Sequence, residues 1–172
     1  MCERENNETE PVEIEVYAYK ELPHGWWHEL DWILPGREEE PTVFELFHDM
    51  MIGSMVGNPV SLEIAQKIVH RLILIEIEHP RRDEVEYVRI MINPTDLKPG
   101  IPDTEPDLII HMKYYDFVRV IMGDLDMMAS IWAGNGWIIG NLTCGLDLRD
   151  LMDASNKGEV HKRPAMWPIG SP

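Results

Sequence analysis

Glycines divide residues 107–152 into short alternating strands and helices, and this punctuation limits the folds that the chain can adopt. "DLIIHM" (107–112) is rich in apolar and β-branched residues and is predicted to be a strand. Two helices should follow, "YYDFVRVIMG" ending at Gly123 and "DMMASIWAG" ending at Gly134, because glycine suits the left-handed position just past a helix. The pattern then predicts an edge or closing strand in "NGWIIGN" and an amphipathic helix in "LDLRDLMDA".

The residues before this segment predict two helices, a β-hairpin and a loop. Thr42 and Glu45 have the spacing of a capping box at the start of "TVFELFHDMMIGSM", and Asn58-Pro59 starts a second helix. The strand-like runs "LILIEIE" and "VEYVRIMI" are joined by "HPRRDE", which predicts a hairpin, and four prolines in "NPTDLKPGIPDTEPD" predict a loop. This order of elements indicates an α+β domain with a sheet covered by helices. The apolar side of the second helix is expected to consist of Leu62, Ala65, Ile68, Val69 and Leu72.

The first 41 residues differ from the rest of the chain. Residues 1–11 are acidic and polar and are expected to form a leader, and the alternation over 12–19 predicts a short strand. The stretch "HGWWHELDW" then places Trp27, Leu30 and Leu34 at helical spacing. We expect a short amphipathic helix whose apolar face packs on the following domain or on a partner subunit.

A metal site in the same stretch is not favoured. His24 and His28 are four residues apart, but His24 lies between Pro23 and Gly25 and therefore precedes the helix. Zinc usually requires at least three protein ligands, and the neighbouring carboxylates point away from the histidine side.

A set of spacings in the second half of the chain has a known counterpart. The set consists of Met112 ending a strand, Asp116-Phe117 in the next helix, the Gly123-x-Leu125 turn, Gly134 11 residues after Gly123, Gly140 six residues later, and Leu146-x-Leu148-x-x-Leu151 in the last helix. In these features the segment resembles the C-terminal half of the sterol carrier protein type 2 domain. The upstream elements follow the same order without strong identities, so the resemblance covers about residues 42–154. Lys113 is a departure, since family members usually place a capping Ser or Thr there.

The resemblance implies an α+β fold with a five-stranded, mostly antiparallel sheet covered on one side by helices. It implies a domain at residues 42–154, preceded by the leader and Trp-rich extension at 1–41 and followed by an irregular tail at 155–172. Family members bind fatty acyl chains, acyl-CoA or sterols in an apolar tunnel, which implies non-catalytic lipid binding or lipid transport with no cofactor. The candidate tunnel-lining residues are Phe117, Ile121, Met128, Trp132, Leu148, Leu151 and Met152.

These seven residues have a second interpretation, because a stripe of Met, Leu and aromatic residues at helical spacing is also typical of an ordinary core. A continuous apolar cavity of several hundred cubic ångströms between sheet and helices would distinguish a tunnel from a core.

The charge of the chain excludes several classes of partner. It has 31 acidic and 15 basic side chains and a formal net charge of −16, which opposes binding to nucleic acid or to anionic lipid surfaces. A basic protein partner would fit. We find no apolar stretch near the ~18 residues of a membrane span, no signal peptide and only Cys2 and Cys144 as cysteines. A soluble, cytoplasmic protein is expected.

The sequence leaves two functions open. It contains no phosphate-binding loop, nucleophile elbow or paired cysteine ligand set, so an enzyme is not expected. The first function is binding or carriage of a hydrophobic ligand. The second is an accessory or scaffold subunit of an enzyme complex that uses the same fold for docking. The Trp-rich extension favours the second, with a protein partner or a homodimer formed through it, because aromatic clusters mark interfaces.

Overall fold

The computed structural model describes residues 17–52 and 58–157. Its elements, in chain order, are the 3-10 helix η1 (Trp26–Glu29), α1 (Val43–Met50), α2 (Pro59–Lys67), β1 (Arg71–Glu78), β2 (Glu86–Ile92), β3 (Asp96–Pro99), β4 (Leu108–Lys113), α3 (Tyr114–Met122), α4 (Met127–Trp132), β5 (Gly136–Gly140) and α5 (Leu142–Lys157).

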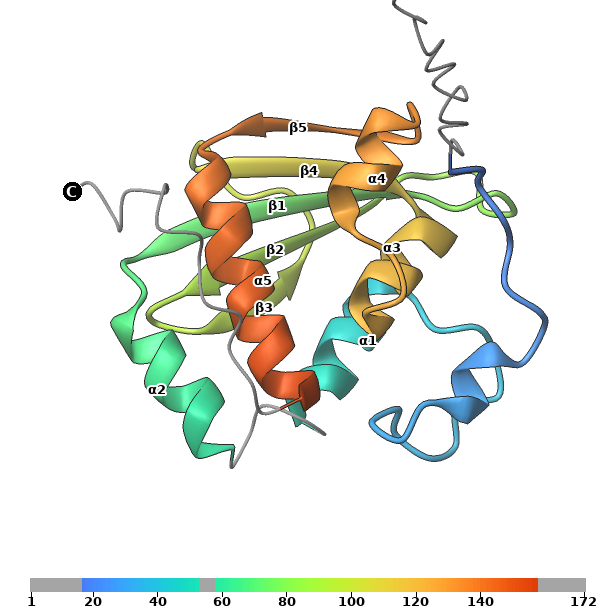
Figure 1. The fold of residues 1–172 in the computed structure, drawn as a ribbon, viewed down its shortest axis with the longest axis horizontal. Helices are drawn as coiled ribbons and strands as arrows, with labels where there is room; N and C mark the ends of the chain where they lie inside the picture. Colours follow the sequence, from blue (N-terminus) through green and yellow to red (C-terminus); the bar gives the residue numbers. More distant parts are fainter. Residues whose placement is uncertain (1–16, 53–57, 158–172) are drawn as a thin grey trace, which may run out of the picture.

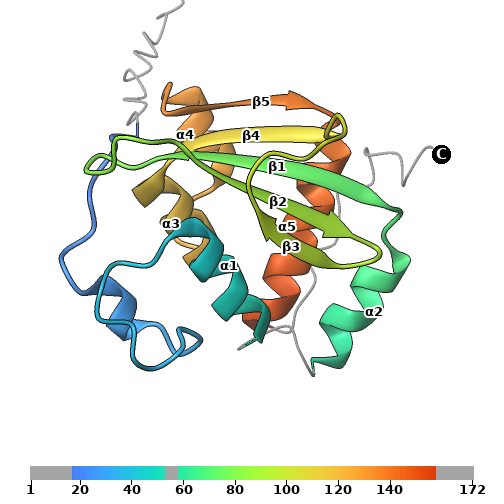
Figure 2. The ribbon, with the colours of Figure 1, turned by 180° about the vertical axis from the view of Figure 1, so that it is seen from behind.

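The strands form one five-stranded sheet in the order β3-β2-β1-β4-β5. β1 and β4 are parallel, and the other neighbouring strands are antiparallel. The α-helices lie together on one side of this sheet, so the molecule has two layers (Figures 1 and 2). The predicted α+β class and the mostly antiparallel, one-side-covered sheet are confirmed.

The two-residue period of the central strands decides which side chains form the core. On β1, Ile73, Ile75 and Ile77 are buried beneath the helices, whereas Glu76 and Glu78 are on the opposite face. On β4 the matching residues in register are Leu108, Ile110 and Met112, which are also buried.

The helix ends follow the sequence signals closely. Thr42 and Glu45 form a complete capping box at the start of α1, with the Thr42 N–H donating to the Glu45 carboxylate over 2.9 Å. The Asn58 side chain accepts two backbone N–H groups in the first turn of α2. Gly123 and Gly134 adopt left-handed φ angles of 80° and 81° past the ends of α3 and α4.

Lys113 supplies no side-chain cap to α3, as its chemistry requires. Its ammonium group instead donates to the Asn135 amide oxygen over 3.2 Å and lies 4.9 Å from the ring centre of Tyr19. The residue therefore joins the start of α3 to the turn before β5 and to the N-terminal extension.

The prediction for the apolar side of α2 is only partly confirmed. Ile68 is buried as predicted, but Leu62 and Val69 are exposed. Ser61, which was not predicted, is buried, and Ile64 packs against the core. The helix ends at Lys67. Val69 and Leu72 lie after its end, so helical periodicity does not decide which way their side chains face. α2 packs on α5 through a face rotated from the one that apolarity alone favours.

The proline-rich segment is not only a loop, since it contains β3, which pairs with β2 through Ile90 and Leu97. The strand ends at Pro99, and proline is tolerated there because β3 lies at the edge of the sheet. Four residues with prolines on both sides carry too short a pattern to identify a strand.

The Trp-rich stretch packs on the domain, which is one of the two alternatives predicted for it; the other was a partner subunit. It is not an amphipathic α-helix. Gly25 adopts a φ of 82°, and only the 3-10 helix η1 follows it. Trp26 and Trp27 are buried and join the same core as the sheet and helices. Each contributes on the order of 4–6 kcal/mol of gross apolar burial. The segment runs along the end of the domain that carries α1 and α3 (Figures 1 and 2).

The chain ends differ from their predicted forms where the structure describes them. Residues 17–20 have no strand partner, and residues 12–16 of the predicted strand lie outside the described residues, as does the leader. α5 starts at Leu142 and continues to Lys157, so the first residues of the predicted irregular tail are helical. The remainder of that tail lies outside the described residues.

Candidate functional site

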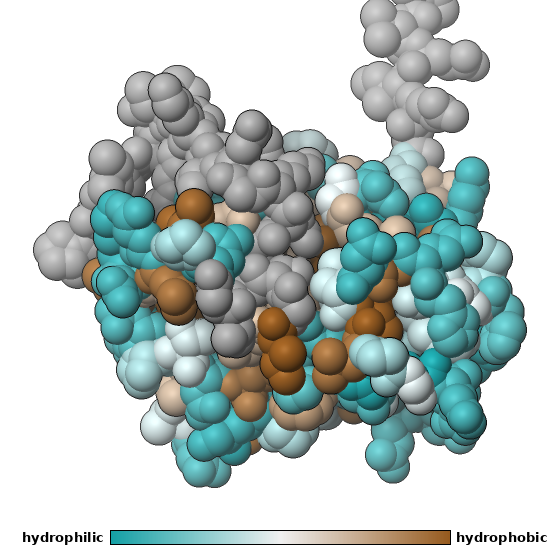
Figure 3. All heavy atoms as spheres, turned by 90° about the horizontal axis from the view of Figure 1, so that it is seen from below, coloured by the Kyte–Doolittle hydropathy of each residue, from teal (hydrophilic) through white to brown (hydrophobic). Residues whose placement is uncertain are grey.

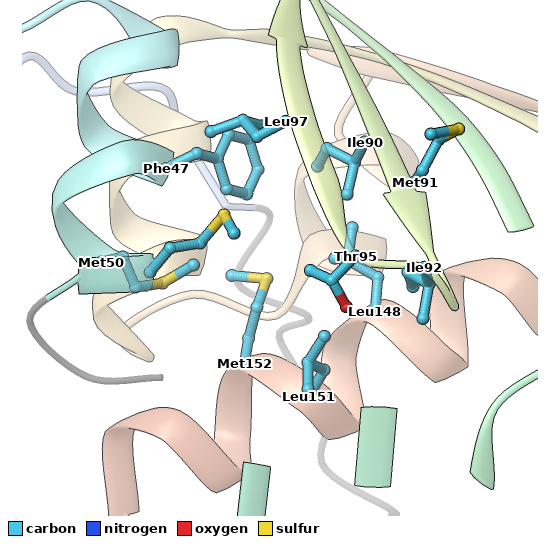
Figure 4. A pocket seen from close by; sticks show the side chains of 11 residues that line it. Phe47, Met50, Ile90, Met91, Ile92, Thr95, Leu97, Leu148, Leu151 and Met152 are labelled. Atoms are coloured by element: carbon cyan, nitrogen blue, oxygen red, sulfur yellow. The ribbon is translucent and has the colours of Figure 1, made fainter. Parts of the chain in front are cut away.

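A small apolar cavity lies where α1 and α5 meet β2 and β3 (Figure 4). α1 and α5 form one wall, and the edge of the sheet forms the other. None of the described residues that line it is charged, and the hydroxyl of Thr95 is the polar side-chain group among them. The lining residues are Phe47, Met50, Met51, Ile90, Met91, Ile92, Thr95, Leu97, Leu148, Leu151 and Met152.

Helical spacing brings these side chains to one place. Leu148, Leu151 and Met152 are at positions i, i+3 and i+4 of α5, and all three are buried on the face toward the sheet. Phe47 and Met50 are in the corresponding relation on α1. Each helix therefore presents one apolar stripe, and the two stripes meet over the edge of the sheet.

The cavity is much smaller than the tunnel implied by the resemblance. Its volume is about 20 Å³, close to the least space that holds one water molecule. At this junction the described residues therefore leave no cavity of several hundred cubic ångströms, and side chains fill the space between the two helices and the edge of the sheet. Seen from the helix side, hydrophobic residues show in separate small patches among hydrophilic ones (Figure 3).

The structure brings only part of the predicted lining set together. Leu148, Leu151 and Met152 line the cavity. Phe117 and Ile121 are buried but are not among the lining residues, and the centre of the Phe117 ring lies 5.3 Å from that of Phe47. The other two residues are on α4 and do not line the cavity.

Of these two, Met128 is only partly buried, and Trp132 is 79% exposed. The interpretation of Trp132 as part of an internal wall is therefore wrong in this structure. In the structure Trp132 is on the face of α4 that points to solvent. α4 has only six residues, so its sequence pattern is too short to show which face packs against the domain.

Sequence reasoning missed the α1 and sheet half of the cavity. Phe47 and Met50 could have been found from the apolar face of α1. Leu97 could not, because β3 was hidden within the proline-rich segment. Ile90 and Ile92 were recognisable as strand residues, but the sequence does not show which helices pack on them, because that depends on the tertiary fold.

Several buried or half-buried polar side chains lie where the extension meets the domain. The Glu40 carboxylate accepts hydrogen bonds from Trp26 Nε1 at 2.9 Å, Tyr115 Oη at 2.8 Å and His79 Nε2 at 2.9 Å. Burial alone would raise the pKa of Glu40, but these hydrogen bonds together lower it. His79 Nδ1 accepts the Arg81 backbone N–H, and burial lowers the pKa of His79. Both histidine nitrogens are occupied, so this cluster is a structural fastening between the extension and the domain.

A second fastening is formed by the fully buried Asp49 of α1. It accepts hydrogen bonds from Arg37 Nε at 2.5 Å, Arg37 Nη2 at 2.7 Å and the Leu34 N–H at 3.1 Å. Burial would raise the pKa of Asp49, but the Arg37 hydrogen bond and the other donors lower it. The carboxylate therefore stays ionised and holds the segment that follows the two tryptophans.

A third fastening is Asp116 of α3, which accepts from Tyr17 Oη at 2.6 Å and Ser130 Oγ at 2.5 Å. Burial and the hydrogen bond with Asp116 raise the pKa of Tyr17 to about 12. Acidic side chains thus join the extension to the domain at separate points, and each has its acceptors occupied.

Within residues 17–52 and 58–157, no group of three or more His, Cys, Asp or Glu side chains is placed to hold a metal ion, and this includes His24 and His28. None of the helices described there is both long and apolar enough to cross a membrane. Cys144 is buried and forms no disulfide, and burial raises the pKa of its thiol.

No protein-family model and no curated protein matches the sequence. Solved structures are nevertheless similar in fold. Sterol carrier protein 2 of Yarrowia lipolytica, in its apo form, aligns with a TM-score of 0.52 at 14% identity over 67% of this chain and 90% of that chain. The sterol carrier protein domain 2 of Helicoverpa armigera aligns with a TM-score of 0.52 at 18% identity, over 74% of this chain and 100% of that chain.

A ubiquinone synthesis protein, UbiJ-SCP2, also has this fold, with a TM-score of 0.52 at 10% identity over 66% of this chain and 95% of that chain. The chain therefore has a sterol carrier protein 2-like fold, as its glycine spacing predicted. At these identities the likeness is one of fold alone.

Proposed function

We propose that this protein binds and carries a hydrophobic ligand, such as a fatty acyl chain, acyl-CoA or sterol-like lipid, without catalysing a reaction. The observation that carries the proposal is the apolar junction of α1, α5, β2 and β3 in a sterol carrier protein 2-like fold, where none of the described lining residues is charged. Transfer of each CH₂ from water into such a site gains about 0.8 kcal/mol. A long chain gains on the order of 10 kcal/mol before the cost of immobilisation, so no catalytic group is required.

In this proposal the ligand enters by parting α5 from α1 and the sheet edge. Leu148, Leu151 and Met152 contact the ligand, and Phe117 and Ile121 form the deeper wall. The methionine side chains that line the junction are unbranched and adaptable, which lowers the cost of repacking around chains of different shape. Met128 and Trp132 on α4 lie away from this path. A cytoplasmic location, which suits the free Cys144 thiol, is part of the same proposal.

Ligand binding can be tested with the fluorescent fatty acid cis-parinaric acid and with lipid extraction and mass spectrometry of the purified protein. We expect co-purified acyl lipid and saturable probe binding. Leu151→Trp adds a bulky ring at the place where α5 must part from the sheet edge to admit the ligand, and it should weaken probe binding at least tenfold. Leu62→Trp makes the same change on the exposed side of α2 and should leave binding unchanged. Absence of co-purified lipid together with no binding of fatty acid, acyl-CoA or sterol would refute carriage.

The alternative function is an accessory or scaffold subunit of an enzyme complex. It is favoured by the filled junction, with a cavity of only about 20 Å³, and by the likeness to UbiJ-SCP2. The structure does not favour docking through Trp26 and Trp27, because both are buried in the domain's own core. A stable heteromer on size-exclusion chromatography, with no lipid in the purified protein, would support this alternative against carriage.

A further inference from the structure

One part of the surface lacks the charge that covers the rest of the protein. Residues 127–146 contain no Asp, Glu, Lys, Arg or His, in a chain with 31 acidic and 15 basic side chains. They form α4, β5 and the start of α5. Half of the large apolar side chains exposed in the described structure belong to this stretch, which we call the neutral edge: Trp132 at 79%, Trp137 at 40%, Ile139 at 61% and Leu142 at 53%.

The two edges of the sheet differ in their protection. β3 ends one side and carries Pro99 and an ion pair between Asp96 and Lys98 at 3.1 Å. Charge and proline of this kind keep an edge strand from pairing with another strand. β5 ends the other side and is "GWIIG", with neither safeguard (Figure 1). Among the described strands only β4 pairs with β5, so the outer backbone N–H and C=O groups of β5 are open to a further strand.

We propose that β5 pairs antiparallel with β5 of a second copy of this chain, which makes one sheet continuous across a homodimer. The strand is self-complementary about Ile138. A two-fold axis at that residue sets Trp137 opposite the second copy's Ile139, and the same pair occurs again by symmetry. Aromatic and β-branched residues are a favourable cross-strand combination.

The geometry of the outer sheet face supports this pairing. Trp137 is held flat by stacking on His111, with ring centres 4.9 Å apart and planes 5° apart. Ile139 lies beside it on the same face, opposite Ile109 of β4. Each copy carries a formal charge of −16, so two copies repel each other over most orientations. Approach through the neutral edge places the smallest density of like charge at the contact.

Sedimentation equilibrium of the full chain tests the proposal. A contact made by one five-residue strand from each copy is small and is expected to be weak, so protein concentrations up to about 500 µM are required. We expect a reversible dimer that strengthens with added salt, since salt screens the repulsion between acidic copies. Hydrogen exchange at the β5 amides should slow as the protein concentration rises. This dimer does not depend on ligand carriage, so failure of either proposal is visible separately.

Two substitutions separate the neutral edge from general apolar association. Ile139→Lys places a charge on the open strand and should raise the dimer dissociation constant at least tenfold. Ile101→Lys makes the same change at an apolar residue that is 60% exposed elsewhere and should leave the constant unchanged. The added lysine lowers the net negative charge in both variants, so loss of the dimer only in Ile139→Lys cannot arise from net charge. A monomer at every concentration, or equal dimers in all three proteins, overturns the proposal, as does a dimer that salt dissociates.

Discussion

The carboxylate of Glu40 should be a sensitive point in the attachment of the extension. Three buried or half-buried donors, Trp26 Nε1, Tyr115 Oη and His79 Nε2, converge on its two oxygens within 2.9 Å. Replacement by glutamine keeps the shape and removes one acceptor oxygen and the charge. At least one of these donors then faces an amide NH₂ group and loses its acceptor.

The magnitude follows from the number of donors affected. A hydrogen bond to a charged group is worth about 1.5–3 kcal/mol, and a buried donor without an acceptor costs about 1–3 kcal/mol. Because these contributions overlap, we expect Glu40→Gln to lower the free energy of unfolding by about 2–4 kcal/mol. This corresponds to a fall in the melting temperature of roughly 4–16 °C for a domain of this size.

The assay is urea unfolding followed by tryptophan fluorescence, with circular dichroism as a second probe. Glu39→Gln is the matched control, since Glu39 is an exposed neighbour with no side-chain hydrogen bond or ion pair among the described contacts. If the free energies of unfolding of the two variants agree within about 0.5 kcal/mol, the reasoning is refuted, because a loss so small is typical of a surface site.

The pH dependence has a defined sign. The pKa values of Glu40 and His79 are both lowered in the folded protein, so the unfolded chain binds protons more readily and falling pH favours unfolding. The His79 contribution should be present above about pH 6.5 and the Glu40 contribution above about pH 4.3, their unfolded values. Both are lost as the pH falls through the lowered folded pKa values. The difference in stability between wild type and Glu40→Gln should therefore shrink below about pH 4.3.

Three further changes test other parts of the structure. Asp49→Asn leaves the Arg37 guanidinium without its buried carboxylate and should cost about 2–4 kcal/mol in urea unfolding. Deletion of residues 1–36 removes both buried tryptophans and should lower the melting temperature and the retention of bound lipid; unchanged solubility and retention would contradict the packing role. Gly140→Ala should cost at least about 2 kcal/mol more than Gly36→Ala, measured by urea unfolding. Both glycines have positive φ angles, but only at Gly140 would the new Cβ lie 2.4 Å from a backbone oxygen.

Local signals determined most of the fold in advance. The capping box at Thr42, the Asn58 cap and the left-handed glycines at 123 and 134 each act within a few residues. A sequence therefore contains them completely. The inward faces of β1 and β4 were determined in the same way, since alternation along a strand is a property of neighbouring residues.

Contacts between distant residues decided the rest. Glu40 is 75 positions from Tyr115 and 39 from His79, and nothing local marks these residues as partners. The same holds for β3, which becomes a strand only because β2 pairs with it. It also holds for the direction in which the short helix α4 turns Trp132.

The Trp-rich stretch shows the division most clearly. Its composition alone required a surface to cover it, because two adjacent tryptophans in water forgo several kcal/mol of apolar burial. The conformation of the stretch depended on Gly25, and the surface on which it packs depended on the hydrogen bonds that Asp49 of α1 and Asp116 of α3 accept from the extension. Likewise, the spacing of apolar residues in the sequence is sufficient to predict the apolar stripes of α1 and α5. Whether they enclose a tunnel or meet as a filled junction depends on the distance between two helices, and packing across the whole domain sets that distance.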